Sequence, residues 1–258
     1  GGFIDTAHVR ETVDWAAFFV AKLDQHLESG ATLELGREGG ERRMTLRPVP
    51  PELIERYGRQ EVLRALAQWM SHQVMAWHEF AQWYGWSIVS LYPEVVSGFS
   101  PEDIYSNAIG ARLLDDIDLE AALSSEKIYN RTIDELIRKE LTALGPVDKE
   151  VGTAAVKAVD QVWWNSQERL PDKSLVLRRY LDADTELEPW LLPEKYASPD
   201  LEADLEEQCG KNPQPHVIHI PDSIDGVPFD ELATMEIVVE GRIAPHPIFQ
   251  KLGRRITH

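Results

Sequence analysis

The chain has 258 residues, 43% of them hydrophobic, which is enough to build one large globular core. Its formal net charge is −18 at pH 7, densest over residues 182–207, and such a surface repels nucleic acid and anionic lipid. Because Cys209 is the one cysteine, an internal disulfide and a cysteine-based zinc cluster are both excluded.

No run of about eighteen apolar residues occurs, so we expect no membrane-spanning segment in this chain. The chain begins with Gly1 and not with methionine. We expect that a segment preceded it: a targeting peptide, a lipoprotein signal that would place a lipid anchor before residue 1, or an expression tag.

The first predicted element is an amphipathic helix over residues 6–29. Asp5 or Thr6 can cap its N-terminus, since both side chains accept hydrogen bonds from backbone N–H groups, and Gly30 ends it. Apolar residues recur at helical spacing and predict the buried face: Val9, Val13, Ala16, Val20 and Leu23.

The next segments predict a hairpin and two helices. Residues 32–35 and 42–46 flank the turn-rich connector Gly-Arg-Glu-Gly-Gly, which is typical of two paired strands. Prolines then break the chain before a short helix over 51–58. A long helix follows over 60–84, and Gly85 ends it.

Ser100 begins another predicted helix, which runs to about residue 114. Ser100 is the expected N-cap, and Asp103 can bond back to it as in a capping box. Further helices are expected at residues 125–144, 148–168 and 173–181.

The remaining chain is predicted to be less helical. Residues 182–215 are acidic and interrupted by prolines, and we expect an extended wrap over the surface. The period then changes, because residues 216–220 alternate and 235–240 are rich in β-branched side chains, so two strands are expected. The chain is therefore predicted to be a single, mainly α domain over 1–258, with a hairpin near 32–46 and a small β-containing tail over 216–258.

The segment 68–86 holds the strongest functional pattern, because His78 and Glu79 lie among several tryptophans. Aromatic surroundings desolvate an imidazole and a carboxylate and shift their pKa values. His-Glu is also the start of the zinc-peptidase pattern His-Glu-x-x-His, but Gln82 stands at its second histidine position. The alternative is a histidine and a glutamate that are hydrogen-bonded inside a polar pocket of the core. The predicted substrate contacts here are Trp77, Gln82, Trp83 and Tyr84.

Two further clusters could complete a site with His78. In the first helix, His8 is a candidate metal ligand, and Asp5 is its cap or its orienting carboxylate. Glu11 and Asp14 there fit better as acids favoured in the first turns. In the helix that begins at Ser100, three polar residues share a face: Asp103, Ser106 and Asn107. Ser106 lacks the Gly-x-Ser-x-Gly elbow of hydrolases, and Asp103 fits a cap better than a catalyst.

Three stretches, GGFIDTAHVR, AWHEFAQWYGW and FSPEDIYSNAIGARL, resemble an uncharacterised bacterial domain family of unknown function that is often found in predicted exported lipoproteins. The resemblance implies a cell-envelope location, periplasmic or lipid-anchored, and a signal removed before Gly1, but no reaction. It groups the residues of those segments into one site: Asp5, His8, Arg10, His78, Glu79, Tyr84, Ser100, Asp103, Ser106 and Asn107.

The leading hypothesis is a metal-assisted hydrolase of the cell envelope that uses a divalent cation such as zinc. The predicted ligands are His8 and His78, with Glu79 or Asp103 as a third, and Glu79 is otherwise the general base. Glu79, Asp103 and Ser106 are the predicted catalytic residues, and Asn107 is a predicted substrate contact. The alternatives are a non-catalytic module that binds a small molecule, glycan or peptide in a tryptophan-lined cleft, and a structural envelope protein.

Overall fold

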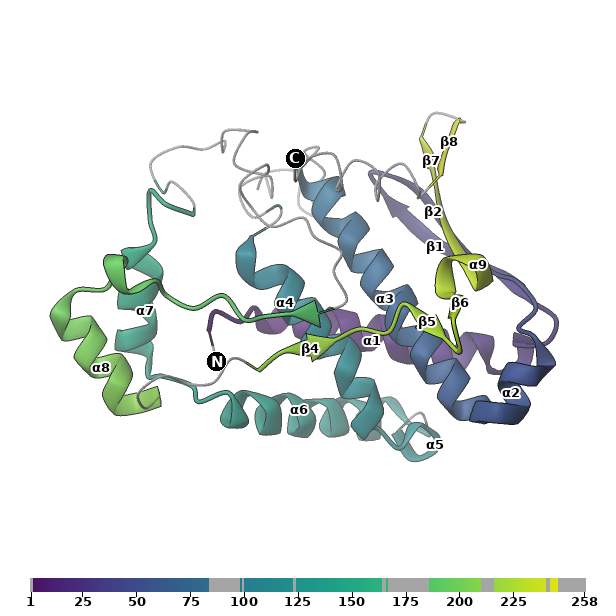
Figure 1. Cartoon of the computed structure of the whole chain (residues 1–258), viewed down its shortest axis with the longest axis horizontal. Coiled ribbons are helices and arrows are strands. Elements are labelled where there is room, and N and C mark those ends of the chain that lie inside the picture. The colour runs from purple at the N-terminus through teal and green to yellow at the C-terminus, as the bar shows by residue number, and fades with distance from the viewer. Residues whose placement is uncertain are drawn as a thin grey trace.

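The computed structural model describes residues 2–83, 98, 100–122, 124–163, 166, 186–209, 216–239 and 242–245. The described chain is mainly helical with a small antiparallel sheet, which confirms the predicted fold class (Figure 1). None of the described helices is long and apolar enough to cross a membrane. In chain order the helices and 3-10 turns are α1 Thr6–Leu23, η1 Asp24–His26, α2 Pro51–Tyr57, α3 Arg59–Trp83, α4 Pro101–Arg112, η3 Leu113–Asp116, α5 Leu119–Ala122, α6 Glu126–Ala143, α7 Lys149–Ala158, η5 Glu194–Tyr196, α8 Pro199–Cys209 and α9 Phe229–Leu232.

The sheet pairs the predicted hairpin with the C-terminal part of the chain. Its strands follow the order β1-β2-β7-β8, all antiparallel, and two short strand pairs, β3-β4 and β5-β6, lie elsewhere. The inner face of the sheet buries Met44, Met235 and Ile237, while Gly39 approaches Trp77 of α3. The strand bounds are β1 Ala31–Glu38, β2 Gly40–Leu46, β3 Glu186–Leu187, β4 Ile218–His219, β5 Ser223–Ile224, β6 Val227–Pro228, β7 Ala233–Val239 and β8 Arg242–Pro245.

The hairpin differs from its prediction in a way that matters for the site. The expected five-residue connector is mostly strand, and the turn itself lies at Gly39, where φ is +62°. The register of β1 against β2 shifts between Glu34 and Arg37, around Gly36 with a φ of +78°. This bulge places both Leu35 and Glu38 on the buried side, although an odd spacing would put them on opposite faces of a regular strand.

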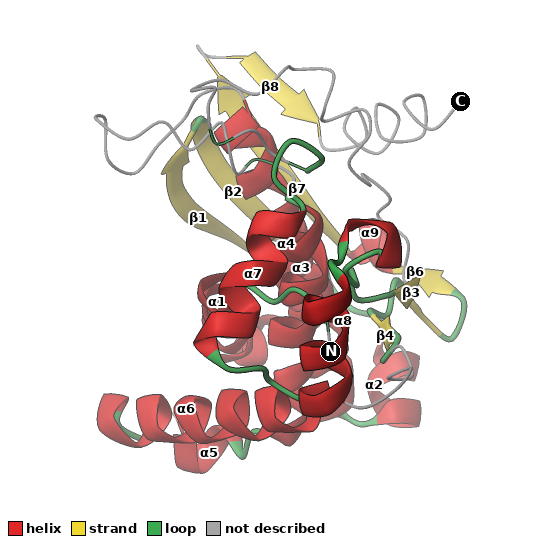
Figure 2. Cartoon of the chain, turned by 90° about the vertical axis from the view of Figure 1, so that its left-hand side faces the viewer, coloured by secondary structure: helices red, strands yellow, loops and turns green. Residues whose placement is uncertain are grey.

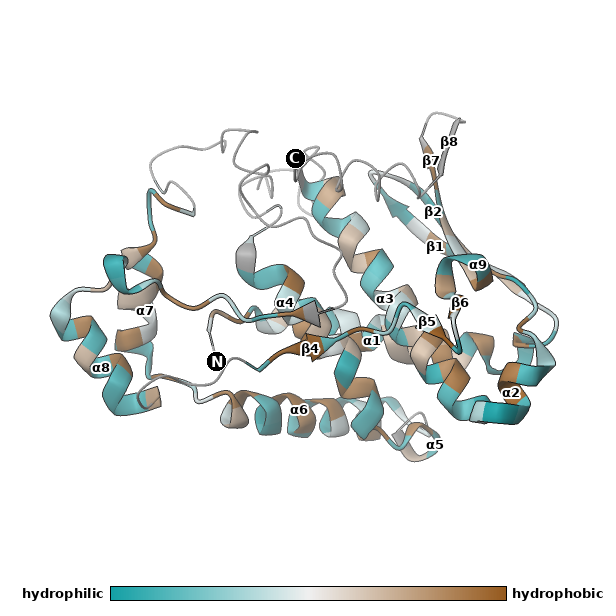
Figure 3. Cartoon of the chain, in the orientation of Figure 1, coloured by the Kyte–Doolittle hydropathy of each residue, from teal (hydrophilic) through white to brown (hydrophobic). Residues whose placement is uncertain are grey.

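Three helices, α1, α3 and α4, pack together and supply the largest share of the described core. Figure 2 shows them between the sheet and α6, which lies across the opposite edge of the molecule. Figure 3 shows hydrophilic and hydrophobic residues alternating along α6, as expected for a helix that covers the core with one side. Ser125 caps α6 by accepting a hydrogen bond from Ile128 N, and Ile133 is its buried anchor.

Several predicted boundaries and caps were wrong. The first helix ends at Leu23, six residues early, and the chain reaches Gly30 through a 3-10 turn. The helix expected over 148–168 ends at Ala158. Ser100 precedes α4 but its side chain makes no capping hydrogen bond, so the predicted capping box is absent there. By contrast Asp5 caps α1 as predicted, accepting from the backbone N–H groups of Ala7 and His8.

The predicted extended wrap over 182–215 was wrong in its C-terminal half, because residues 199–209 form α8. Pro199 begins this helix, where its missing N–H costs nothing, and Leu201 is its buried contact. Figure 1 places α8 beside α7, and Gln208 bonds the N-cap residue Asp148. The expected short helix over 173–181 lies outside the described residues.

Gly110 sets the distance between α1 and α4. A Cβ atom at this position would lie 2.4 Å from the carbonyl oxygen of Val9 and 2.7 Å from Cβ of Thr12. The carbonyl oxygen of Val9 belongs to the helix backbone and cannot rotate away as a flexible side chain could. The two helices can therefore approach this closely only with glycine at position 110.

We predict that Gly110→Ala lowers the free energy of unfolding by about 1–3 kcal/mol, because the added methyl group forces α1 and α4 apart. Urea denaturation measures the change. Gly152→Ala on α7 is the matched control, since its Cβ would meet its nearest neighbour at 3.6 Å, an ordinary contact. The control is expected to be neutral or stabilising by about 0.5–1 kcal/mol. Equal effects of the two substitutions would contradict the helix contact.

A buried histidine on α3 makes stability depend on pH. Burial lowers the pKa of His72 to about 4, and its Nδ1 has no hydrogen-bond partner within the described residues. The unfolded chain, with an ordinary histidine pKa near 6.5, therefore binds a proton between pH 6.5 and 4 while the folded protein does not. The stability that this neutral ring contributes is complete above pH 6.5 and is lost as the pH falls towards 4.

We predict that His72→Leu reduces the acid-induced loss of unfolding free energy between pH 6.5 and 4 by up to about 3 kcal/mol. Urea denaturation at a series of pH values measures the slope. His26→Gln, at an exposed histidine in η1, should leave the slope unchanged. A slope unaltered by His72→Leu would show that the ring titrates normally in the folded protein.

Candidate functional site

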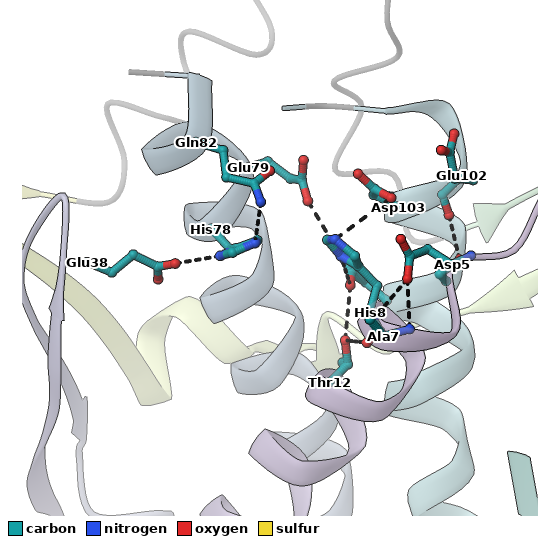
Figure 4. A network of polar contacts seen from close by, with 12 residues as sticks. Asp5, Ala7, His8, Thr12, Glu38, His78, Glu79, Gln82, Glu102 and Asp103 are labelled. Carbon is teal, nitrogen blue, oxygen red and sulfur yellow. Dashed lines mark hydrogen bonds and ion pairs between the residues drawn. The ribbon is translucent and has the colours of Figure 1, made fainter. Parts of the chain in front are cut away.

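A polar cluster lies where the N-terminus of α1 meets α3 and the start of α4 (Figure 4). Asp5, His8 and Asp103 each offer one ligand atom to this cluster, and these atoms all lie within 4.8 Å of one another. His8 and Asp103 are buried and Asp5 is half-buried. One imidazole and two carboxylates at this separation are suited to hold a divalent cation.

The ring of His8 is held by partners on both of its nitrogens. Its Nδ1 lies 3.1 Å from Oδ1 of Asn107 and 3.6 Å from Oε1 of Glu79, and its Nε2 lies 3.8 Å from Oδ1 of Asp103. The hydroxyl of Thr12 is also 3.1 Å from the same Asn107 oxygen. If Nδ1 carries the proton and donates it to Asn107, Nε2 presents its lone pair towards Asp103.

Asp5 is fixed by its backbone as well as by its cap. Its side chain accepts from Ala7 N at 2.7 Å and from His8 N at 3.2 Å, and its own N–H donates to Oγ of Ser106 at 2.8 Å. Ser106 in turn donates to the carbonyl of Glu102 in its own helix. Because both hydrogen-bonding roles of this buried hydroxyl are used, its position favours tying α1 to α4 over the predicted nucleophile role.

His78 lies beside this group and not within it. The ring centroids of His8 and His78 are 5.6 Å apart in an edge-to-face arrangement, so the two helix segments that the sequence singled out, in α1 and α3, do meet. Nδ1 of His78 lies 2.5 Å from Oε1 of Glu38, and its Nε2 lies 2.7 Å from Nε2 of Gln82. Both ring nitrogens are therefore engaged by protein groups, and the converging three-residue group does not include His78 or Glu79.

Glu38 joins the site to the sheet. Its carboxylate also pairs with the Arg42 guanidinium, and its carbonyl accepts from the Trp77 indole N–H at 2.8 Å. Burial by itself lowers the pKa of His78, but the hydrogen bond and charge of Glu38, with the charges of Glu79 and Glu11, outweigh it and hold that pKa above its ordinary value. These carboxylates thus favour the imidazolium form of His78. In that form Nε2 donates, and its acceptor would be the amide oxygen of Gln82.

Several other residues of the predicted site lie outside the three-residue group. Trp77 is buried, so it is not an open platform for a ligand. Glu11 is exposed, and Asp14 bonds Arg10 and the hydroxyl of Tyr129, away from the three-residue group. Tyr84 lies outside the described residues, as does the side chain of Trp83.

Two residues of the cluster were missing from the predicted site. Glu38 falls in a connector rich in glycine, where the sequence indicates a turn, and only the bulge turns its side chain inwards. Arg42 gives no signal in the sequence beyond its place in a predicted strand. Asp5 was expected as a cap or orienting carboxylate, and its place three residues before His8 was the usable signal.

We predict that Glu38→Gln lowers the free energy of unfolding by about 3–5 kcal/mol, because it leaves the buried Arg42 without its charge partner. Glu34→Gln is the matched control, since Glu34 pairs with Arg43 across the same two strands but on the exposed side. It should cost less than about 1 kcal/mol. Denaturant titration compares the two, and equal costs would contradict the burial of the Glu38 pair.

Comparison with known proteins adds one match. Residues 1–193 match the family model described as "Protein of unknown function (DUF4056)", while no curated protein and no solved structure matches the chain. The matched part contains the whole polar cluster. Since the match covers about three quarters of the 258 residues, the chain belongs to the DUF4056 family of proteins of unknown function.

Proposed function

We propose that the protein is a metal-dependent hydrolase, and that Asp5, His8 and Asp103 hold its divalent cation. The observation that carries the proposal is the convergence of these three ligand atoms within 4.8 Å. Catalytic zinc sites commonly use three protein ligands from histidine and carboxylate side chains and leave a fourth position for water or substrate. Zinc is therefore the first cation to test, and manganese is the second because carboxylates also suit it.

The surroundings of His8 support a ligand role. A metal-bound histidine usually donates its second ring N–H to a carbonyl or carboxylate oxygen, which fixes the ring and its tautomer. Asn107 Oδ1 at 3.1 Å from Nδ1 offers such an acceptor, and Glu79 Oε1 at 3.6 Å adds a negative charge on the same side. In this arrangement Nε2 is the ligand atom.

Glu79 is the proposed proton acceptor. The cation would supply Lewis acidity, which lowers the pKa of a water molecule at the open position. Glu79 would accept one proton from the attacking water as the water oxygen bonds to the electrophilic atom of the substrate, and it would return this proton to the leaving group as the scissile bond breaks. The reaction consumes one water molecule and needs no further reactant.

The proposed setting is the bacterial cell envelope, with a glycan, peptide or smaller molecule as substrate. The resemblance to a family that is often found in predicted exported lipoproteins supports the location, and the net charge of −18 disfavours nucleic acid as a partner. Among the predicted substrate contacts, Gln82 lies beside His78 at the edge of the cluster.

The test is metal binding to protein purified without a histidine tag and stripped with a chelator. We expect one equivalent of Zn²⁺ or Mn²⁺ by calorimetry and elemental analysis. His8→Ala, Asp103→Asn and Asp5→Asn should each weaken binding by at least about tenfold. Loss of a residue that only hydrogen-bonds to a metal ligand already has an effect of about this size. Asp5→Asn is informative because asparagine caps a helix as well as aspartate does and removes only the charge.

His26→Ala, at an exposed histidine, is the control and should bind the cation like the unaltered protein. Glu79→Gln should keep the cation but lose hydrolysis of a panel of p-nitrophenyl esters, phosphates and glycosides. Binding that survives His8→Ala, or no binding at all, would refute the metal site. Equal hydrolysis by Glu79→Gln and the unaltered protein would refute the role of Glu79.

A further inference from the structure

A hollow opens beside the polar cluster, between α1 and β1. Its walls are Trp15, Phe18 and Leu35, and three carboxylates line its rim: Glu11, Asp14 and Glu34. Its volume of about 330 Å³ matches the lower end of the range for small-ligand sites. No lysine or arginine is part of its lining.

The hollow continues the stripe of α1 that carries His8. Glu11, Trp15 and Phe18 follow His8 at intervals of three and four residues, so the four side chains lie along one side of the helix. On the facing strand, Leu35 lines the hollow, and the bulge turns Glu38 to the same buried side, where it contacts His78. The end of the hollow at Glu11 is therefore the end nearest the polar cluster, and the charge of Glu11 acts on His78.

The three rim carboxylates differ in their partners. The two oxygens of Asp14 accept a bifurcated hydrogen bond from Nε–H of Arg10, and Glu34 pairs with Arg43. The side chain of Glu11 makes no hydrogen bond or ion pair within the part of the chain that the structure describes. The nearby Arg42, over the Trp15 ring at 5.4 Å, is neutralised by buried Glu38. The rim charge that no cationic side chain of the described residues pairs with is therefore the negative charge of Glu11, at the end of the hollow nearest the polar cluster.

We propose that this hollow binds an organic cation: an ammonium group on an apolar stem, with the ammonium at Glu11 and the stem against Trp15, Phe18 and Leu35. An apolar stem gains from leaving water along these walls, and the ammonium gains from Glu11 and from the field of a chain with net charge −18. This inference goes beyond the proposed hydrolase and does not depend on it, because none of the lining residues belongs to the metal group.

The test compares three probes with the same stem: n-hexylammonium, 1-hexanol and hexanoate. Binding is followed by saturation-transfer NMR of the probe and by the shift of the Trp15 indole signal, which is assigned with Trp15→Phe. We expect hexylammonium to bind with a Kd of roughly 1 mM, hexanol to bind more weakly, and hexanoate to bind least. Leu35→Ala should weaken hexylammonium and hexanol alike.

Glu11→Gln should weaken hexylammonium by about fivefold, the upper range for a solvent-exposed ion pair, and leave hexanol unchanged. Glu55→Gln, at an exposed glutamate on α2, is the matched control and should change neither probe. His8→Ala should also leave hexylammonium binding unchanged, which separates this result from that of the metal test. Equal or tighter binding of hexanol or hexanoate, an unchanged Kd in Glu11→Gln, or no Trp15 shift at about 20 mM probe would overturn the proposal.

Discussion

The close contact of α1 with α4 at Gly110 is the constraint on which the site depends. Gly110, Asn107 and Asp103 recur at intervals of three and four residues, so one face of α4 carries the helix contact and two site residues. The absence of a side chain at Gly110 lets that face meet α1 at Val9 and Thr12. Packing of two helix backbones thereby sets the distance between His8 and Asp103.

Burial then decides how the polar groups are arranged. A polar group that is removed from water needs a hydrogen-bond partner, and in this cluster the partners come from different helices. Thr12 and His8 of α1 share the amide of Asn107 in α4, and the backbone of Asp5 bonds Ser106. Each of these bonds both satisfies a buried group and holds a member or a neighbour of the three-residue group in place.

The bulge in β1 links this helical site to the sheet. Without the extra residue, Leu35 and Glu38 could not both face inwards. With it, Glu38 reaches His78 and Arg42, and Leu35 forms a wall of the hollow on α1. One local irregularity of the backbone therefore supplies the carboxylate that raises the pKa of His78 and part of the neighbouring apolar surface.

The sequence by itself determined most of the longer helices, the hairpin and the main site segments, because hydrophobic period, caps and glycines act over a few residues. Asp5 capped α1, Gly39 lay within the predicted turn region, and His8, His78 and Asp103 were singled out by residue type. Only the tertiary structure decided which of them converge: Asp5 joined His8 and Asp103, while His78 paired with Glu38. Those contacts span up to about a hundred residues of chain, and they depend on a helix crossing and a bulge that no local pattern encodes.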